Sequence, residues 1–242
     1  MAEARRIAVV TGSSSGIGAA IARALAEDGL TVVVNSSSSV AAGEELAGEI
    51  GGAYEQADVS DREQAGGLIE RAVERFGRLD LLVNNAATTV TIPHRDLDAV
   101  TAEIWAKILD TNLLGAWWTT AAAVPHLRSA EDGQVINITS TSASRPAGSS
   151  IPYAVAKAGL DHMTRLLAKA LGPEVRVNAV APGLVDTPWS ADWEEVKEQV
   201  AGSVAMRRVG QPEDIAAACR LVIGTPYMTG AVVNVDGGLS LL

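Results

Sequence analysis

Tyr153 and Lys157 stand four residues apart, and Ser140 precedes Tyr153 by thirteen residues. Four residues are about one helical turn, so the tyrosine and the lysine are expected on the same face of one helix. A phenol has an unperturbed pKa of about 10. An ammonium group about 4 Å away would favour the phenolate by roughly 4 kcal/mol at an effective dielectric constant near 20. That would bring the phenol pKa near 7, where general acid–base chemistry at a substrate oxygen is efficient.

A glycine-rich turn, Thr11-Gly-Ser-Ser-Ser-Gly-Ile-Gly18, follows an apolar run at residues 7–10. Glycines between a strand and a helix permit a tight turn and let the backbone approach a pyrophosphate, whose charge faces the helix N-terminus. A plain strand–helix turn would show the same glycines. The candidate cofactor-binding residues of this turn are Gly12, Ser14, Ser15, Gly16, Ile17 and Gly18. Together the two features predict proton transfer beside a bound hydride carrier.

Apolar, β-rich runs alternate with helical patterns along the whole chain and would position both features. Strands are expected at residues 7–10, 31–34, 53–57, 79–83, 134–138, 175–181 and 231–235. Helices are expected at residues 17–28, 41–50, 62–76, 101–127, 153–171 and 212–221. This alternation predicts an α/β fold: a Rossmann-type, doubly wound parallel sheet of about seven strands with helices on both faces. Ligands of such a sheet bind at the carboxyl ends of the strands.

Length and composition favour one domain that spans residues 1–242, since no linker, repeat or low-complexity tract divides the chain. A net charge of −10 argues against nucleic acid and anionic membrane surfaces as partners. The apolar run at residues 7–10 is too short for a signal peptide or a membrane span. A single cysteine, Cys219, is expected to be a buried thiol, which fits a cytoplasmic location. The three histidines lack metal-ligand spacing, so no metal is expected.

The chain resembles the classical short-chain dehydrogenase/reductase family over almost its whole length. The turn at Thr11–Gly18 is similar to the family's T-G-x-x-x-G-x-G motif, and Tyr153–Lys157 to its Y-x-x-x-K motif. Further matches are Asp58-Val59, Asn84–Ala87, Asp110-Thr-Asn112, Ile138-Thr-Ser140, Asn178–Gly183 with Thr187, and Gly230 with Val235–Gly238. Two departures are Ala87, where the family usually has glycine, and a short connection at residues 221–230.

The resemblance implies a role for each of four residues. Tyr153 exchanges a proton with the substrate oxygen, Ser140 hydrogen-bonds that oxygen, and Lys157 lowers the tyrosine pKa and binds the nicotinamide ribose. Asn112 helps to hold a water that relays protons. Beyond the glycine turn, the implied cofactor-binding residues are Asn35, Ser36, Ser37, Asp58, Val59, Asn85, Ala86, Tyr153, Lys157, Pro182, Gly183, Val185 and Thr187.

The end of the second expected strand bears on the choice between NADP(H) and NAD(H). An acidic residue there would hold the ribose hydroxyls of NAD, and a basic residue would favour the 2′-phosphate of NADP. This chain has neither, because the strand runs into Asn35-Ser-Ser-Ser-Ser39. Serine hydroxyls and a helix start can hold a phosphate, whereas an acid would repel it. NADP(H) is therefore favoured. A polar loop that contacts no ligand would have the same serine-rich sequence.

The substrate is expected to be a small-molecule carbonyl or alcohol. Ser144 and residues 149–151 are candidates for the pocket wall. By resemblance, residues 188–206 form a mobile lid, in which Trp189 and Trp193 either face the pocket or pack internally. Trp117 and Trp118 lie on a helix that packs against a second subunit in relatives, so a homotetramer is expected.

Two other functions fit the same motifs. A 3-ketoacyl-acyl-carrier-protein reductase is the closest rival, but Glu131 and Pro173 align with two arginines by which such enzymes grip their acidic carrier. A non-catalytic cofactor-binding sensor would usually lack one of the four catalytic residues, and none is lacking here. Enoyl reductases of the wider family place the tyrosine and lysine farther apart.

Overall fold

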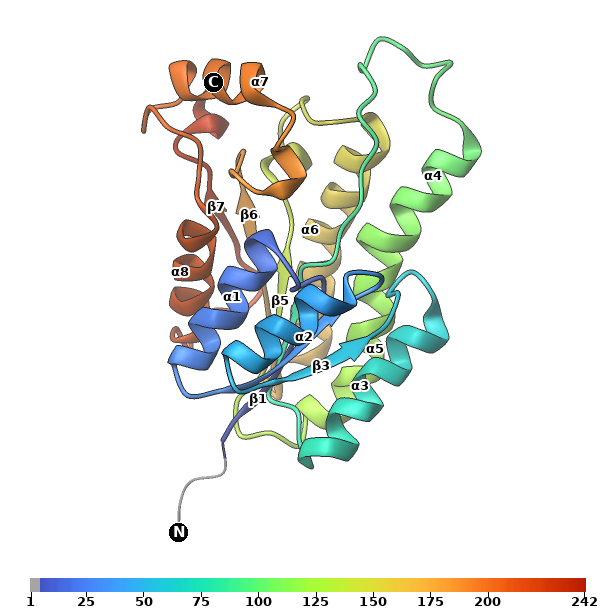
Figure 1. The fold of residues 1–242 in the computed structure, drawn as a ribbon, viewed down its shortest axis with the longest axis vertical. Coiled ribbons are helices and arrows are strands. Elements are labelled where there is room, and N and C mark those ends of the chain that lie inside the picture. The colour runs from blue at the N-terminus through green and yellow to red at the C-terminus, as the bar shows by residue number, and fades with distance from the viewer. Residues whose placement is uncertain (1–4) are drawn as a thin grey trace.

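The computed structural model describes residues 5–242 and contains one seven-stranded parallel sheet in the order β3-β2-β1-β4-β5-β6-β7 (Figure 1). Residues 1–4 lie outside this range. The strands are β1 (Ile7–Val10), β2 (Thr31–Ser36), β3 (Ala53–Gln56), β4 (Leu81–Asn84), β5 (Gly133–Ile138), β6 (Val175–Pro182) and β7 (Val232–Val235). The predicted Rossmann-type fold in a single domain is confirmed.

Helices cover both faces of the sheet. They are α1 (Gly16–Glu27), α2 (Val40–Glu49), α3 (Arg62–Phe76), α4 (Ala102–Leu109), α5 (Gly115–Leu127), α6 (Ile151–Leu171), α7 (Glu194–Ser203) and α8 (Pro212–Ile223). Side chains of α1, α2 and α8 share one hydrophobic core, and those of α3, α5 and α6 share the other. The central strands are continuous apolar runs because both of their faces are buried.

β1 and β4 pair with each other in parallel at the middle of the sheet. From β1 the chain order runs outward through β2 and β3, and from β4 it runs the opposite way through β5, β6 and β7, so the strand order reverses between β1 and β4. A crevice forms at such a switch point, outside the carboxyl ends of the strands. The glycine turn follows β1, and Ser140 follows β5. The fold therefore brings the two chemical features of the sequence to one edge of the sheet.

The helix predicted at residues 101–127 is present from Ala102 to Leu127, but it is not α-helical throughout. A π-helical turn at Asp110–Leu114 separates α4 from α5. The side-chain amide of Asn112 donates to the Ile108 carbonyl at 2.8 Å, the acceptor that the Asn112 backbone N–H would use in an α-helix. Asparagine thus competes with the helix backbone for its own acceptor, and the periodicity of the sequence does not reveal this competition.

Arg176 fixes the short connection between α8 and β7. Its guanidinium donates to the carbonyls of Ile223 and Thr225 at 3.0 Å and of Met228 at 3.2 Å, and it pairs with Asp132 at 3.1 Å. Only 11% of the side chain is exposed. The Arg176 guanidinium thus ties this connection to β6.

We expect Arg176→Met to lower the free energy of unfolding by about 3 kcal/mol, because several buried carbonyls would lose their donor. For a chain of this size the melting temperature should fall by roughly 6–12 °C. Arg23→Met is a matched control, because the Arg23–Glu49 pair is about half exposed and should contribute less than about 1 kcal/mol. Equal melting temperatures of the two variants in thermal unfolding would contradict this account.

Candidate active site

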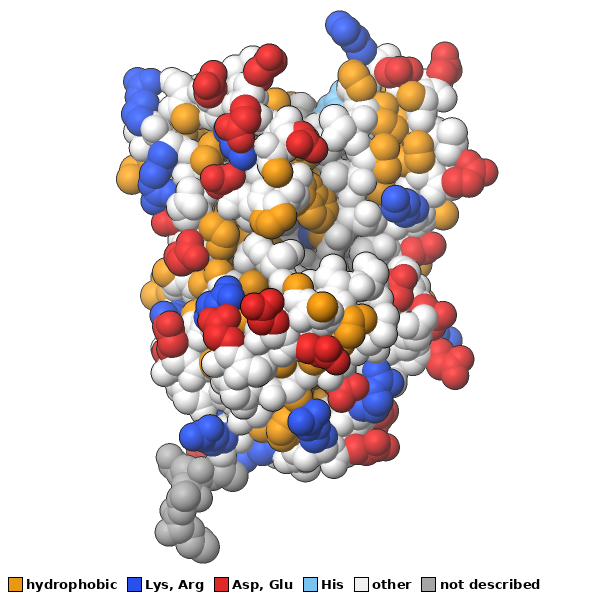
Figure 2. Space-filling model, in the orientation of Figure 1, with side chains coloured by type: hydrophobic (Ala, Val, Ile, Leu, Met, Phe, Trp, Pro, Cys, Tyr) orange, Lys and Arg blue, Asp and Glu red, His pale blue; other side chains and the backbone are white. Residues whose placement is uncertain are grey.

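One cavity of about 680 Å³ lies at the carboxyl ends of the strands. Figure 2 shows the surface hollowed in this region, between α7 and the segment that precedes α4. Ser140 and all of the residues predicted to bind the cofactor line the cavity. Asn112 is absent from the lining, although its neighbour Thr111 is present. The structure therefore brings three of the four predicted catalytic residues together with the complete predicted cofactor cradle.

The glycine turn has no room for a side chain at Gly12 or Gly18. Gly12 has a φ of +60°, and a Cβ there would lie 2.8 Å from the Cα of Ala86. A Cβ on Gly18 would lie 2.5 Å from the Gly12 carbonyl oxygen. The Thr11 hydroxyl accepts hydrogen bonds from the N–H groups of Asn85 and Ala86, both at 3.0 Å, and so fixes the turn against the segment after β4. Sequence reasoning missed this positioning role of Thr11.

The three serines of the turn have different surroundings. Ser13 is buried, and its hydroxyl donates to the Val10 carbonyl at 2.6 Å. Ser14 and Ser15 line the cavity, and Ser15 is the N-cap of α1 without making a capping hydrogen bond with its side chain. Their hydroxyls and the start of α1 are therefore available to an anion. The residues present fit the pyrophosphate of a dinucleotide.

Asn35 at the end of β2 is buried, and its amide is engaged within the protein. It donates to the carbonyls of Glu55 and Ala57 at 3.1 Å and accepts from the Gly12 N–H at 3.2 Å. Asn35 thus secures the glycine turn. Ser36 is likewise bound, with its hydroxyl 2.8 Å from that of Tyr54.

The next three serines are exposed, whereas Asn35 and Ser36 are buried. Ser37, Ser38 and Ser39 all line the cavity, and Ser39 is the N-cap of α2 without a side-chain capping bond. Ser38 and Ser39 were not among the predicted cofactor residues. No acidic or basic side chain lines this end of the cavity except Asp58. One oxygen of Asp58 already accepts hydrogen bonds from the N–H and hydroxyl of Ser60.

Ser140, Tyr153 and Lys157 come from two elements that meet at the cavity. Ser140 caps a short 3₁₀ helix after β5, and its hydroxyl accepts a bond from the Ser142 N–H at 3.1 Å. Tyr153 lies in the first turn of α6, with Lys157 one turn later. The Lys157 ammonium donates to the Ile138 carbonyl at 2.8 Å and lies 5.8 Å from the centre of the tyrosine ring. Both side chains thus point to the end of β5.

The predicted lowering of the Tyr153 pKa is wrong for this structure. Burial raises the pKa of Tyr153 to about 12, and the Ser140 side chain opposes this rise only in part. Burial also lowers the pKa of Lys157 to about 8, while the charge of Asp161 opposes that change. The attraction expected between the ammonium and the phenolate at about 4 Å is outweighed by the cost of removing both charged groups from water. At neutral pH the phenol is protonated, and the lysine still carries its charge.

Asn112 lies outside the cavity lining and is fully engaged. Its side-chain amide donates to the carbonyls of Thr88 and Ile108, each at 2.8 Å, and its oxygen accepts from the Thr88 N–H at 3.3 Å. The side chain thus holds the segment after β4 against the π-turn. In this arrangement Asn112 is a positioning residue.

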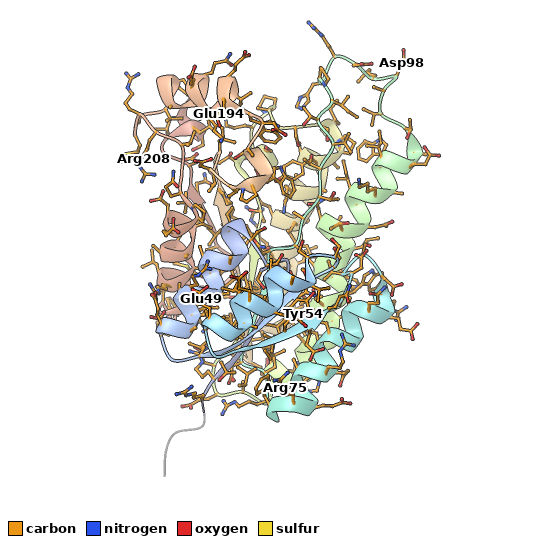
Figure 3. The ribbon with its side chains drawn as sticks, viewed as in Figure 1. Glu49, Tyr54, Arg75, Asp98, Glu194 and Arg208 are labelled. Carbon is orange, nitrogen blue, oxygen red and sulfur yellow. The ribbon has the colours of Figure 1, made fainter. Side chains whose placement is uncertain are left out.

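The substrate end of the cavity has an apolar wall. Trp189, Trp193, Val196 and Val200 line it from the segment predicted as a lid. Figure 3 shows Glu194 of α7 on one side of the opening and Asp98, in the segment before α4, on the other. The Trp189 and Tyr153 ring centres are 6.4 Å apart. Both tryptophans also line a second cavity of about 430 Å³.

Predictions for the loop after Ser140 are mixed. Ser149 lines the cavity, and its hydroxyl lies 2.5 Å from that of Thr89. Ser144, Ser150 and Ile151 are not part of the lining, so their predicted place in the pocket wall is wrong: the Ser144 hydroxyl turns back to the Thr141 carbonyl. Arg145 does line the cavity and was missed. It is the only charged residue in the small-residue segment 139–150, which is the signal that could have revealed it.

Two further properties of the described residues concern metals and membranes. Within residues 5–242, no group of three His, Cys, Asp or Glu side chains could hold a metal ion. No helix in the same range is long and apolar enough to cross a membrane.

Comparison with known proteins gives a consistent set of similarities. A family model described as Enoyl-(Acyl carrier protein) reductase matches residues 12–240. The chain is 51% identical to a protein of Streptomyces violaceoruber named as ketoacyl reductase 2 of the granaticin polyketide synthase, over 98% of this chain and 96% of that protein. It is 33% identical to a Thermotoga maritima protein named 3-oxoacyl-[acyl-carrier-protein] reductase, over 97% of each.

Solved structures include proteins with a similar fold. A Burkholderia xenovorans protein described as a short-chain dehydrogenase/reductase superposes with a TM-score of 0.91. It is 32% identical in sequence, and the match covers 99% of this chain and all of the other.

Proposed function

The chain belongs to the classical short-chain dehydrogenase/reductase family and is an oxidoreductase that interconverts a carbonyl and an alcohol with a nicotinamide cofactor; from this premise we propose that it reduces a small-molecule ketone or aldehyde with NADPH. One observation carries the proposal. Ser140, Tyr153 and Lys157 line the same cavity as the glycine turn, so a proton donor lies beside the cradle of a hydride carrier.

Each residue has a distinct part in the proposed reaction. The bound nicotinamide supplies the hydride. Tyr153 donates a proton to the substrate oxygen; burial raises the pKa of Tyr153 to about 12, so the phenol carries the proton to be donated at neutral pH. The Ser140 hydroxyl stabilises the charge that develops on that oxygen. Lys157 stabilises the tyrosinate left after proton donation, and Asn112 keeps the Thr88 segment in register with the cavity.

The test of this function is a binding titration followed by turnover. NADPH should bind at least about tenfold more tightly than NADH, a difference of roughly 1.4 kcal/mol. The NADPH-loaded enzyme should then reduce members of a panel of aromatic, cyclic and aliphatic ketones and aldehydes. Binding of NADPH without turnover of any carbonyl would instead favour the cofactor-binding sensor.

The preference for NADP(H) rests on the exposed serines after β2. Ser37, Ser38 and Ser39 present hydroxyls at the start of α2. Asp58 is the one acidic residue in the lining at this end, and one of its oxygens is already bound to Ser60. Hydroxyl groups and a helix N-terminus together can hold a 2′-phosphate. Asn35 contributes indirectly, because its amide is bound to the glycine turn and the β3 backbone.

We expect Ser37→Asp to lower kcat/KM for NADPH by about 10–100-fold while changing kcat/KM for NADH by less than about threefold. Two like charges about 5 Å apart repel by roughly 1–3 kcal/mol at the dielectric constants of a protein surface. Ser144→Asp is the control, because Ser144 is exposed but lies outside the cavity lining. An equal loss with both cofactors would refute a phosphate site at these serines.

A second candidate is a ketoacyl reductase that acts on carrier-bound thioesters. The 51% identity with the protein named ketoacyl reductase 2 favours it. The net charge of −10, and the acidic and apolar residues Glu131 and Pro173 at the expected carrier contacts, disfavour docking of an acidic carrier. The two candidates separate in one assay: acetoacetyl-carrier protein should be reduced no better than acetoacetyl-N-acetylcysteamine. A carrier-dependent gain above tenfold in kcat/KM would favour the second candidate.

We also propose assembly and location. Trp117, Val155 and Leu166 are 40%, 47% and 56% exposed on α5 and α6, and would be covered in a homotetramer. Light scattering during size-exclusion chromatography should give four times the 25.0 kDa chain mass. The single buried thiol, Cys219, fits a reducing cytoplasm.

A further inference from the structure

Arg145 lines the cavity, and its charge has no protein partner among the residues that the structure describes. Its side chain is only partly exposed, and it forms no salt bridge or side-chain hydrogen bond among residues 5–242. The charge of Arg145 helps to lower the pKa of Asp236. The two Asp236 carboxylate oxygens, however, already accept hydrogen bonds from the N–H groups of Gly238 and Ser240, at 2.9 and 2.8 Å. A half-buried guanidinium with free donors favours an anionic group in the cavity.

The other charged residues that line the cavity already have predicted roles, and Arg145 does not. Only Asp58, Arg145 and Lys157 carry charge among the residues that line the cavity. Asp58 follows β3 and is one of the predicted cofactor-binding residues, and Lys157 donates to the Ile138 carbonyl. Among the charged residues of this lining, Arg145 is therefore the one that belongs neither to the predicted cofactor-binding set nor to the predicted catalytic set.

The same cavity also has apolar and aromatic lining. Trp189 and Val196 are 43% and 46% exposed although they line the cavity, so they offer apolar area that no protein side chain covers. Leu239 lines the same cavity. The Trp189 ring is tilted by 58° to that of Tyr153, with ring centres 6.4 Å apart, and a further ring could pack against this aromatic pair.

We propose that the substrate is a keto acid with an aromatic or cyclic body, whose carboxylate binds Arg145 while its ring packs against Trp189 and Trp193. This inference rests on the proposed carbonyl reduction and names its substrate class. A carboxylate accepts two parallel N–H bonds from a guanidinium, which fixes orientation as well as affinity. The carbonyl is then held between Ser140 and Tyr153.

The chemical step is balanced. The carbonyl carbon receives a hydride from the reduced nicotinamide, and the carbonyl oxygen receives the proton of Tyr153 as the C=O π bond breaks. The products are a hydroxy acid, the oxidised cofactor and a tyrosinate that regains its proton from solvent. The carboxylate keeps its charge throughout, so Arg145 orients the substrate without exchanging a proton.

The test uses a pair of probes that differ in charge. Purified enzyme with NADPH is assayed on 4-oxo-4-phenylbutanoate and on its methyl ester, and we expect kcat/KM to be at least tenfold higher for the acid. In Arg145→Met the ratio should fall to within about twofold of one, and in Arg145→Lys it should stay between these values. Arg75→Met, at the far end of α3 (Figure 3), should keep the wild-type ratio.

Binding provides a readout that does not need turnover. Quenching of tryptophan fluorescence by 4-phenylbutanoate should give a Kd at least tenfold lower than that of its methyl ester in the NADP⁺-loaded enzyme, and Arg145→Met should abolish the difference. Equal Kd values for acid and ester would overturn the carboxylate subsite. The aliphatic acid 4-oxopentanoate should have a kcat/KM at least tenfold below that of the phenyl acid, and equality would overturn the aromatic part. Lack of turnover on the whole carbonyl panel, with acid-selective binding intact, would reject the proposed function alone.

Discussion

Tyr153→Phe should lower kcat by at least about 10², because the variant keeps the ring and loses only the proton donor. General acid catalysis typically contributes 10²–10⁴ in rate. The aromatic contact with Trp189 involves the ring and should persist. Both kcat and kcat/KM should fall by the same factor, as expected when an interaction is made only in the transition state. Steady-state kinetics with NADPH and a ketone that the enzyme turns over would measure this effect.

The control for this variant is cofactor binding. The glycine turn and the serines after β2 lie on other elements, so the Kd for NADPH should change by less than about threefold. Trp118→Phe, a substitution on α5 outside the cavity lining, should leave both kcat and Kd near the wild-type values. Wild-type turnover by Tyr153→Phe would remove Tyr153 from the mechanism.

Lys157→Met should lower kcat/KM by at least about 10² and at the same time stabilise the protein at neutral pH. Only 2% of Lys157 is exposed, and burial lowers its pKa from 10.5 to about 8. At 1.36 kcal/mol per pKa unit, the buried charge costs about 3 kcal/mol below pH 8. Loss of the hydrogen bond to Ile138 offsets about 1 kcal/mol of the gain. Urea unfolding at pH 7 should therefore show the variant more stable by about 2 kcal/mol.

The pH dependence of this difference follows from the direction of the shift. Between pH 8 and 10.5 the unfolded chain holds a proton on Lys157 that the folded protein has released, so wild-type stability rises with pH relative to the variant. The stability advantage of Lys157→Met should shrink as pH rises from 7 to 9.5. Wild-type kcat/KM for reduction should fall above about pH 8, where Lys157 loses its charge. A stability difference that is independent of pH would show that Lys157 is not a buried ammonium.

These two variants separate chemistry from folding. Tyr153→Phe removes a reacting group and should leave stability almost unchanged, whereas Lys157→Met removes a charge whose burial destabilises the fold. Residues that are kept for function at a cost in stability are common in active sites. The expected opposite changes in activity and stability make Lys157 the clearer example in this chain.

Several features of the site could be predicted because they depend on local chemistry. The glycines at positions 12, 16 and 18 are needed wherever a strand turns directly into a helix beside a phosphate. Tyr153 and Lys157 share a face because four residues make one helical turn. The order of strands and helices implied a parallel sheet, and a parallel sheet gathers its loops at one edge.

Other features depend on distances between segments that are far apart in the sequence. The amide of Asn35 is bound to Gly12 and the β3 backbone, and the side chain of Asn112 replaces a backbone donor at Ile108. Neither contact leaves a periodic trace in the sequence. The pKa of Tyr153 was predicted in the wrong direction because desolvation depends on the whole surrounding structure, whereas the spacing from Lys157 is local.

The fold class and the reaction class could be predicted from the sequence, because the alternation of strands and helices and the order of the motifs are properties of the chain alone. Which side chains remain free for a ligand could be read only from the three-dimensional arrangement. Serines 37–39 and Arg145 are open to the cavity, whereas Asn35 and Ser36 are already bound. A polar side chain can bind a ligand only with donors and acceptors that the protein leaves unused, and that balance is set by packing between distant segments.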